Sequence, residues 1–253
     1  WLEREFIDQK IVERAVAFDV SPKLVSEAKK ERGKRKIEYF VADANKIELE
    51  KESFDLIVNN AALHHVQLIN RICFVLADSL KENGYLINFD YIGPHRNQYP
   101  LKQWELANNV NSELPEDIRQ DMRYPHLPTM LVTDPTEAIH SELIIESIDR
   151  YFDITERHDT GGGIAYLIFT NNKKLNKIPA EKLRKYIDIV LKYDQEYSEK
   201  DLIPPLFSYF IAKPDKDSLK RRERNEIFQD DENKREKIAE DSGGIYAFSR
   251  DYP

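Results

Sequence analysis

Three short apolar runs near the beginning of the chain each end in polar residues that could bind a ligand. These endings are Asp19 after Ala15–Phe18, Asp43 after Ile37–Val41, and Asn59–Asn60 after Phe54–Val58. A carboxylate accepts hydrogen bonds from two neighbouring hydroxyl groups, so Asp19 is suited to bind a ribose. Asp43, one run later, is placed to accept from an adenine amino group. The pattern predicts a site for an adenosine-containing cofactor.

Helix signals separate the apolar runs, which identifies the runs as strands of a parallel sheet. Ser21 and Pro22 are suited to the N-cap and first position of a helix. A second helix is predicted over Leu68–Lys81, closed by Asn83–Gly84, before a strand over Tyr85–Phe89. Because strands and helices alternate, we expect a Rossmann-like, doubly wound and mostly parallel α/β sheet. Its ligands would lie outside the carboxyl ends of the strands.

The chain becomes richer in Pro, Asn, Gln, Tyr and His from Gly93 onward. Long irregular insertions in compact domains are commonly lids or binding loops, so we expect helical lid insertions over residues 92–150 and 160–200. Within the first insertion, Asp134 and Glu137 have the spacing of a capping box, which predicts a helix that begins there.

Two later apolar runs, Tyr151–Arg157 and Leu206–Ala212, are predicted to complete the sheet. The domain would then span residues 1–213. The remainder, 214–253, is highly charged and is predicted to be an extension that forms a solvated helix or linker.

Together these motifs resemble a class I S-adenosylmethionine-dependent methyltransferase. The similarity lies in the strand endings at Asp19 and Asp43, in Phe54–Val58, and in the segment Leu63–Val66 that follows. The resemblance implies a seven-stranded sheet and S-adenosylmethionine as the cofactor. It also implies cofactor-binding roles for Asp19 and Val20 at the ribose, Asp43 and Ala44 at the adenine, and Asn60 and Ala61 at the methionine end.

One part of the family pattern does not occur in this sequence. The glycine-rich turn after the first strand should precede the ribose-binding acid by roughly 20 residues. Counting back from Asp19 places that turn just before Trp1, so the first strand and the turn are expected to be missing.

His64 and His65 follow the third apolar run, where an acceptor hydroxyl would meet the methyl donor. A histidine there is suited to act as the general base, although capping or packing of a helix start explains the pair equally well. Neighbouring residues point to different faces, so we expect at most one of the two to act. We expect no metal site, because no carboxylate follows the pair at a useful spacing.

Residues after Phe89 suit the binding of a polar substrate. Tyr91, Arg96 and Tyr99 are the predicted contacts. This region loosely resembles bacterial methyltransferases of glycan pathways, which implies methyl transfer to a hydroxyl of a small molecule or glycan.

Two alternative functions remain open. Val58–Ala61 resembles a motif of nicotinamide-dependent short-chain dehydrogenases, and Tyr209 with Lys213 would be their acid/base pair. A non-catalytic, methyltransferase-like partner subunit is the second alternative, because the glycine-rich turn is missing.

The composition narrows the partners and the compartment. A net charge of −8 argues against nucleic acid as the partner, and the single cysteine excludes an internal disulfide framework. With no transmembrane-length run or signal peptide, we expect a cytoplasmic protein without a membrane partner. The aromatic tail Ile245–Phe248 is a candidate contact for its own domain or for a second copy in a homo-oligomer.

Overall fold

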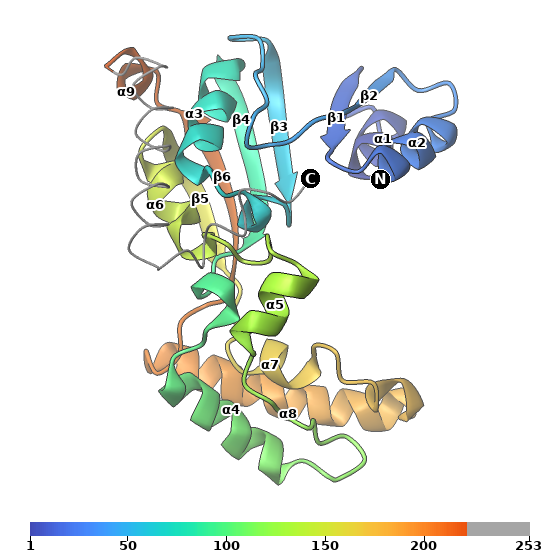
Figure 1. Ribbon diagram of the computed structural model, residues 1–253, viewed down its shortest axis with the longest axis vertical. Helices are drawn as coiled ribbons and strands as arrows, with labels where there is room; N and C mark the ends of the chain where they lie inside the picture. The colour runs from blue at the N-terminus through green and yellow to red at the C-terminus, as the bar shows by residue number, and fades with distance from the viewer. Residues whose placement is uncertain (222–253) are drawn as a thin grey trace. The chain divides into compact units, whose positions relative to one another are not determined.

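The computed structural model describes residues 1–221, which form parts of two compact units, 1–49 and 50–253. The first unit is a small α/β unit with a two-stranded parallel sheet (Figure 1). Its elements are α1 (Leu2–Asp8), β1 (Ala15–Asp19), α2 (Pro22–Glu31) and β2 (Ile37–Val41). Val25, Ile37 and Tyr39 form its buried core. The predicted helix start is confirmed, since the Ser21 side chain accepts a hydrogen bond from the Leu24 N–H.

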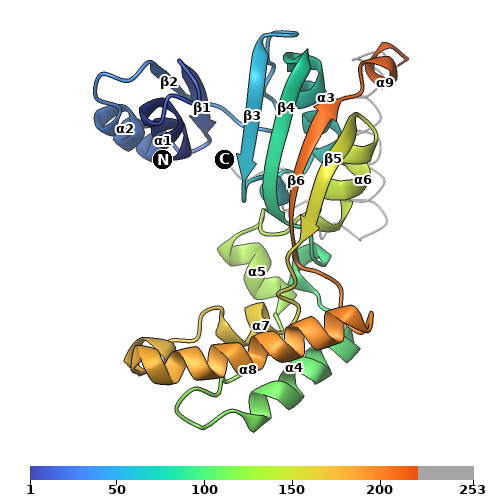
Figure 2. The ribbon, with the colours of Figure 1, turned by 180° about the vertical axis from the view of Figure 1, so that it is seen from behind.

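The second unit contains a four-stranded mixed sheet with the order β3-β4-β6-β5. Strands β3 (Phe54–Asn60) and β4 (Leu80–Tyr91) are parallel, whereas β6 (Phe207–Pro214) runs antiparallel to β4 and to β5 (Phe152–Asp159). Figure 2 shows the four strands from behind in this order. The two predicted late strands are therefore confirmed.

The prediction of one doubly wound, mostly parallel sheet is only partly right. The structure has an α/β fold, but β1 and β2 pair only with each other in the described part of the chain. Three of the four strands in the second sheet form antiparallel pairs, because β6 enters between β4 and β5 in the opposite direction. The described part of the chain therefore has a two-stranded parallel sheet and a four-stranded mixed sheet, rather than one seven-stranded sheet.

The predicted end of the helix over Leu68–Lys81 is wrong. Helix α3 (Ile69–Ser79) ends earlier, and Asn83–Gly84 lie inside β4. The pairing of β3 with β4 shifts register between Phe54 and Leu56, so residues 81–84 form an irregularity within the strand. The turn-forming residues therefore interrupt a ladder rather than cap a helix.

Helices lie against one face of the second sheet and beyond one of its ends. Helices α3 and α6 (Ile144–Asp149) cover one face, and a further group lies beyond the carboxyl ends of β3 and β4 (Figures 1 and 2). We call this group the helical layer; it consists of α4 (Leu101–Glu113), α5 (Leu127–Thr133), α7 (Ala165–Phe169) and α8 (Ala180–Glu199). Its core contains Val110, Ile168 and Val190. The helical layer comes from the two predicted insertions.

Short 3₁₀ helices connect these elements, and several of them contain residues of the candidate sites described below. They are η1 (Leu63–His65), η2 (His95–Asn97), η3 (Ser141–Leu143) and η4 (Leu175–Lys177). The helix predicted to begin at the capping box is wrong, because residues 134–140 form turns and bends. The Asp134 carboxylate accepts from the N–H and hydroxyl of Thr136, which is a local turn rather than a helix cap.

The predicted charged extension lies almost entirely outside the described residues. Its described part begins at Pro214, the last residue of β6, and includes the short helix α9 (Lys216–Lys220). The aromatic tail Ile245–Phe248 also lies outside. Among the helices of residues 1–221, none has both the length and the apolar character needed to cross a membrane.

Candidate active site

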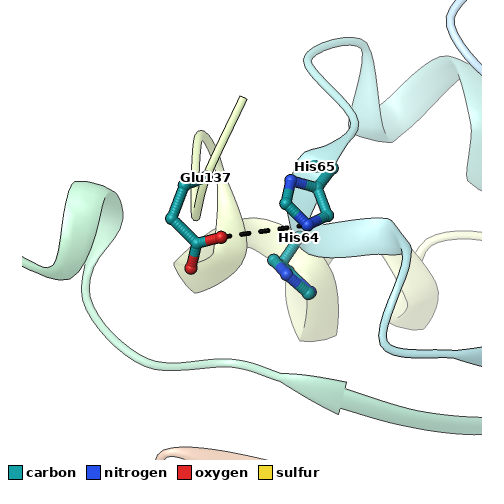
Figure 3. A group of neighbouring side chains, drawn as sticks. All are labelled: His64, His65 and Glu137. Atoms are coloured by element: carbon teal, nitrogen blue, oxygen red, sulfur yellow. Dashed lines mark ion pairs between the residues drawn. The ribbon is translucent and has the colours of Figure 1, made fainter. Parts of the chain in front are cut away.

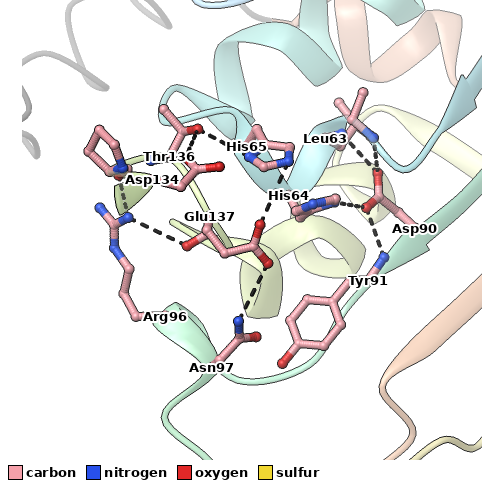
Figure 4. A network of polar contacts seen from close by, with 12 residues as sticks. Leu63, His64, His65, Asp90, Tyr91, Arg96, Asn97, Asp134, Thr136 and Glu137 are labelled. Atoms are coloured by element: carbon pink, nitrogen blue, oxygen red, sulfur yellow. Dashed lines mark hydrogen bonds and ion pairs between the residues drawn. The ribbon is translucent and has the colours of Figure 1, made fainter. Parts of the chain in front are cut away.

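The second unit holds a buried pair formed by a histidine and a carboxylate. His64 lies in η1, just beyond the end of β3, and Asp90 is the penultimate residue of β4. Because the two strands are parallel neighbours, their carboxyl ends bring the two side chains together. His64 Nδ1 lies 2.6 Å from Asp90 Oδ1 (Figure 4). His64 Nε2 makes no hydrogen bond among the described residues.

Asp90 is fully buried and receives hydrogen bonds from several donors. Its Oδ2 accepts from Asn59 Nδ2 at 2.6 Å and from the N–H groups of Ala62 and Leu63 at 3.1 and 2.8 Å. Its Oδ1 accepts from the Tyr91 N–H at 2.8 Å. Donors on both oxygens stabilise the ionised carboxylate in a buried position. They also fix the direction in which it faces His64.

The charge of Asp90 controls the protonation of His64. Burial lowers the pKa of His64, but the hydrogen bond and charge of Asp90 outweigh it, and the net pKa is raised above its usual 6.5. An ionised Asp90 accepts from Nδ1–H, which leaves the Nε2 lone pair of neutral His64 available. The pair therefore has the arrangement of an oriented general base.

His65 belongs to a neighbouring polar chain that reaches the first insertion. Its Nδ1 lies 3.1 Å from the Thr136 hydroxyl, which donates to Asp134. Its Nε2 lies 3.8 Å from Glu137 Oε2 (Figure 3). One potential metal-ligand atom from each of His64, His65 and Glu137 lies within 4.8 Å of the others. The carboxylate that the histidine pair lacks nearby in sequence is thus supplied from a distant segment.

Arg96 holds the segment that contains Glu137 in place. It is 1% exposed, and its guanidinium donates to the backbone carbonyls of Pro135 and Glu137. The adjacent Asn97 donates to the Glu137 carboxylate at 3.4 Å (Figure 4). Arg96 was predicted to contact substrate, but in the structure its described hydrogen bonds hold the Pro135–Glu137 backbone in place.

Tyrosine side chains form the apolar wall beside His64. Tyr91 and Tyr99 are buried, and the Tyr91 ring lies edge-on to the His64 ring at a centroid distance of 6.3 Å. Burial and the neighbouring Tyr99 raise the pKa of Tyr91, so its phenol stays protonated. Tyr166 from α7 stacks obliquely on Tyr91, with centroids 6.1 Å apart. Of the three predicted substrate contacts, the structure thus brings Tyr91 beside His64, and Tyr99 lies next to Tyr91.

The predicted adenosine contacts lie in the first unit. Asp19 ends β1, and its main-chain oxygen accepts from the Ala42 N–H, so Asp43 follows at the same end of the sheet. In each carboxylate, Oδ1 accepts from a backbone N–H two residues on, at Ser21 and Asn45. Neither Oδ2 has a described hydrogen bond, although Asp43 Oδ2 lies 3.8 Å from Lys46 Nζ. Each carboxylate therefore has an oxygen suited to a ribose hydroxyl or an adenine amino group.

The remaining predicted cofactor contacts lie at or just after the ends of strands. Val20 and Ala44 are the residues next to the two acids, and Val20 is largely exposed. Asn60 is the exposed last residue of β3, and Ala61 has a positive φ of 53° while its N–H donates to the Phe89 carbonyl. The chain therefore turns sharply at Ala61 into η1, which places the two histidines.

The proposed dehydrogenase pair does not assemble. Tyr209 and Lys213 both lie on strand β6, where four residues span about 13 Å. Lys213 Nζ lies over the Tyr85 ring, and Tyr209 stacks on His158. The two side chains therefore have separate partners and do not form an acid/base pair.

Sequence reasoning missed the carboxylates of the site. Asp90 interrupts the apolar end of a strand, the same signal that identified Asp19, and it could have been found in this way. Glu137 and Thr136 could not, because they meet the histidines only after a long insertion has folded back.

Comparison with known proteins supports the family resemblance. Residues 3–88 match the family described as methyltransferase domain. No curated protein matches the chain significantly. Solved structures with similarity include a S-adenosylmethionine-dependent methyltransferase from Mesorhizobium loti, with 15% identity, TM-score 0.49, and coverage of 82% of this chain and 83% of that chain. Haemonchus contortus phosphoethanolamine N-methyltransferase 2 has 15% identity and TM-score 0.49, over 83% of this chain and 46% of that chain. At such scores neither structure is a guide to the substrate.

Proposed function

We propose that this chain, whose residues 3–88 match the methyltransferase domain family, uses S-adenosylmethionine to transfer a methyl group to a hydroxyl of a small molecule or glycan. The family match supports the reaction and the cofactor. The observation that carries the choice of a hydroxyl is the His64–Asp90 pair. A neutral alcohol is a weak nucleophile, and its proton must leave as the new bond forms.

The cofactor, when bound, supplies the electrophilic methyl group on its sulfonium. In the first unit, we assign Asp19 and Val20 to the ribose, and Asp43 and Ala44 to the adenine. Their support is the Oδ2 atom of each carboxylate, which makes no hydrogen bond among the described residues. Asn60 and Ala61 are assigned to the methionine end.

In the proposed reaction, the acceptor hydroxyl donates its hydrogen bond to His64 Nε2. The proton of that hydroxyl would move to Nε2 as the oxygen accepts the methyl group that the cofactor supplies. The resulting imidazolium is stabilised by the Asp90 carboxylate at 2.6 Å. His64 is thus the proposed catalytic base, and Asp90 is a positioning residue.

The substrate is proposed to lie against Tyr91, whose ring is beside His64, and against the neighbouring Tyr99. His65 is assigned to the polar chain through Thr136 rather than to proton transfer. The helical layer, built from the insertions 92–150 and 160–200, is the proposed lid over this site.

Two substitutions of one residue test the proposed base. His64→Asn retains a donor near the position of Nδ1 and therefore the hydrogen bond to Asp90, but it removes Nε2. We expect His64→Asn to lower kcat by about 10²–10⁴-fold, which is the usual contribution of a general base. His64→Gln, which loses the contact with Asp90, should be equally inactive and less stable.

The measurement is formation of S-adenosylhomocysteine with a panel of glycosides and small hydroxylated compounds, each paired with its amino analogue. His158→Asn, on the exposed strand β5, is the matched control and should retain full activity. The hydroxyl proposal fails if only amino analogues accept the methyl group. The base assignment fails if His64→Asn transfers methyl groups as fast as the wild type.

A further inference from the structure

A second cluster of histidines and a carboxylate lies beside the site already described and shares no residue with it. His95 is in η2, His140 precedes η3, and Glu142 is in η3. One potential ligand atom from each lies within 4.8 Å of the other two. His95 Nδ1 lies 3.8 Å from Glu142 Oε1, and the rings of His95 and His140 are stacked with centroids 5.7 Å apart.

Main-chain contacts hold the two turns together without help from this cluster. The Arg96 N–H donates to the Ala138 carbonyl at 2.7 Å, and the buried Ser141 hydroxyl donates to the Gly93 carbonyl at 2.8 Å. A hydrogen bond to the backbone of Ile139 further fixes the His95 ring. The two turns that carry the three side chains are therefore held in place by neighbouring residues.

His140 has no other evident role in the described part of the chain. Neither nitrogen of its largely buried ring makes a hydrogen bond with residues 1–221. Either ring nitrogen is therefore available as a metal ligand.

We propose that His95, His140 and Glu142 bind a first-row divalent metal ion such as Zn²⁺. Two imidazoles and one carboxylate are a donor set that Zn²⁺ binds well, with a fourth position open to water or another ligand. In a tetrahedral zinc site, ligand atoms lie about 3.3 Å apart because the bonds are near 2.0 Å. The 3.8 Å between His95 Nδ1 and Glu142 Oε1 is close to that separation.

Such an ion would join the turn after β4 to the turn that follows Glu137. The first turn contains Arg96 and Asn97. The second turn directly follows Pro135–Glu137, the segment to which these two residues donate hydrogen bonds. The ion would therefore stabilise the wall of the candidate active site without contacting the reacting groups. The site does not depend on the proposed function, because its readout is metal binding.

The test is calorimetric titration of Zn²⁺ into the full chain without an affinity tag, followed by Co²⁺ absorption spectra. We expect one saturable Zn²⁺ site in the wild type and a Co²⁺ spectrum of a nitrogen/oxygen site. His140→Asn and Glu142→Gln should each weaken Zn²⁺ binding by at least about 10-fold, the loss that even supporting residues of metal sites produce. Glu142→Gln is nearly isosteric and at the surface, so it tests the site even if His140→Asn is unstable.

Two controls locate the ion. His158→Asn removes a surface histidine that is paired with Glu156 at 2.7 Å, and it should leave binding unchanged. His65→Asn removes a member of the other histidine cluster and should also leave binding unchanged. The proposal is overturned if the wild type shows no saturable binding, or if Glu142→Gln and a folded His140→Asn bind Zn²⁺ like the wild type. It is equally overturned if His65→Asn alone abolishes binding.

Discussion

His64 and Asp90 are joined by a 2.6 Å hydrogen bond at the adjacent carboxyl ends of two parallel strands. The same buried carboxylate accepts from Asn59 and from three backbone N–H groups. Such a carboxylate cannot turn away from the histidine without leaving buried donors unpaired, which would cost about 1–3 kcal/mol for each. The carboxyl ends of β3 and β4 therefore fix the orientation of the His64 ring through Asp90.

The pH dependence of the reaction should depend on this pair. Only neutral His64 can accept a proton, so kcat/KM should rise with pH through its pKa, which Asp90 raises above 6.5. In Asp90→Asn the burial that lowers the pKa acts without the opposing carboxylate, and the inflection should move to lower pH. A pH–rate profile, or ¹⁵N titration of the imidazole by NMR, measures the shift. An inflection at the same pH in both proteins would contradict the coupling.

The same pKa shift affects stability in a defined direction. Because the folded pKa of His64 is raised, protonation stabilises the folded state. This contribution is fully present below about pH 6.5 and is lost as the pH rises through the folded pKa. The free energy of unfolding of His64→Asn should lack this dependence in urea titrations at several pH values. An identical pH dependence in wild type and variant would show that His64 does not titrate as described.

Arg96 should be important for stability although it was predicted to contact substrate. Arg96→Lys leaves at least one of the two carbonyls of Pro135 and Glu137 without its buried donor. We expect a loss of about 2–4 kcal/mol in the free energy of unfolding, since hydrogen bonds from charged donors contribute about 1.5–3 kcal/mol each. Arg123→Lys, at an exposed ion pair, is the control and should change stability by less than about 0.5 kcal/mol. Equal free energies of unfolding for Arg96→Lys and Arg123→Lys would contradict the role of Arg96 in holding the Pro135–Glu137 backbone.

The helical layer depends on one buried carboxylate in α8. Asp194 accepts from the N–H groups of Gly162, Ile164 and Ala165, each at 2.8 Å, and so fixes the start of α7. Asp194→Asn places an amide among these donors, and we expect a loss of about 2–4 kcal/mol in the free energy of unfolding. Asp188→Asn, on an exposed face of the same helix, should be nearly neutral. Denaturant titration distinguishes them, and a neutral Asp194→Asn would refute the role.

The alternation of strands and helices predicted those positions of the candidate site that depend only on local sequence. Asp19 and Asp43 follow their strands at the same end of one sheet, as parallel pairing requires. The histidine pair was also placed correctly, because η1 begins a few residues after β3. These features depend on short segments whose side chains point according to the strand period.

Contacts between distant segments could not be read in this way. Asp134 and Glu137 have the spacing of a helix cap, yet Thr136 and Glu137 contact His65 and Asn97 instead. The hydrogen bonds between Asp134 and Thr136 form a local turn in place of a helix start. The contacts of Thr136 and Glu137 with His65 and Asn97 then hold the segment in this conformation. The second histidine cluster has the same origin, since His95 and His140 come from two separate turns.

The most direct test of the central claim is calorimetric titration of S-adenosylhomocysteine into the wild type and into Asp19→Asn and Asp43→Asn. Loss of a charged hydrogen-bond acceptor corresponds to about 1.5–3 kcal/mol, so each variant should bind roughly 10–100-fold more weakly. Asp55→Asn, at an exposed carboxylate of β3 that pairs with Lys81, is the control and should bind like the wild type. Saturable 1:1 binding that is weakened only in Asp19→Asn and Asp43→Asn is the predicted result. Absence of binding by the wild type, or binding unaffected by Asp19→Asn, would contradict the account.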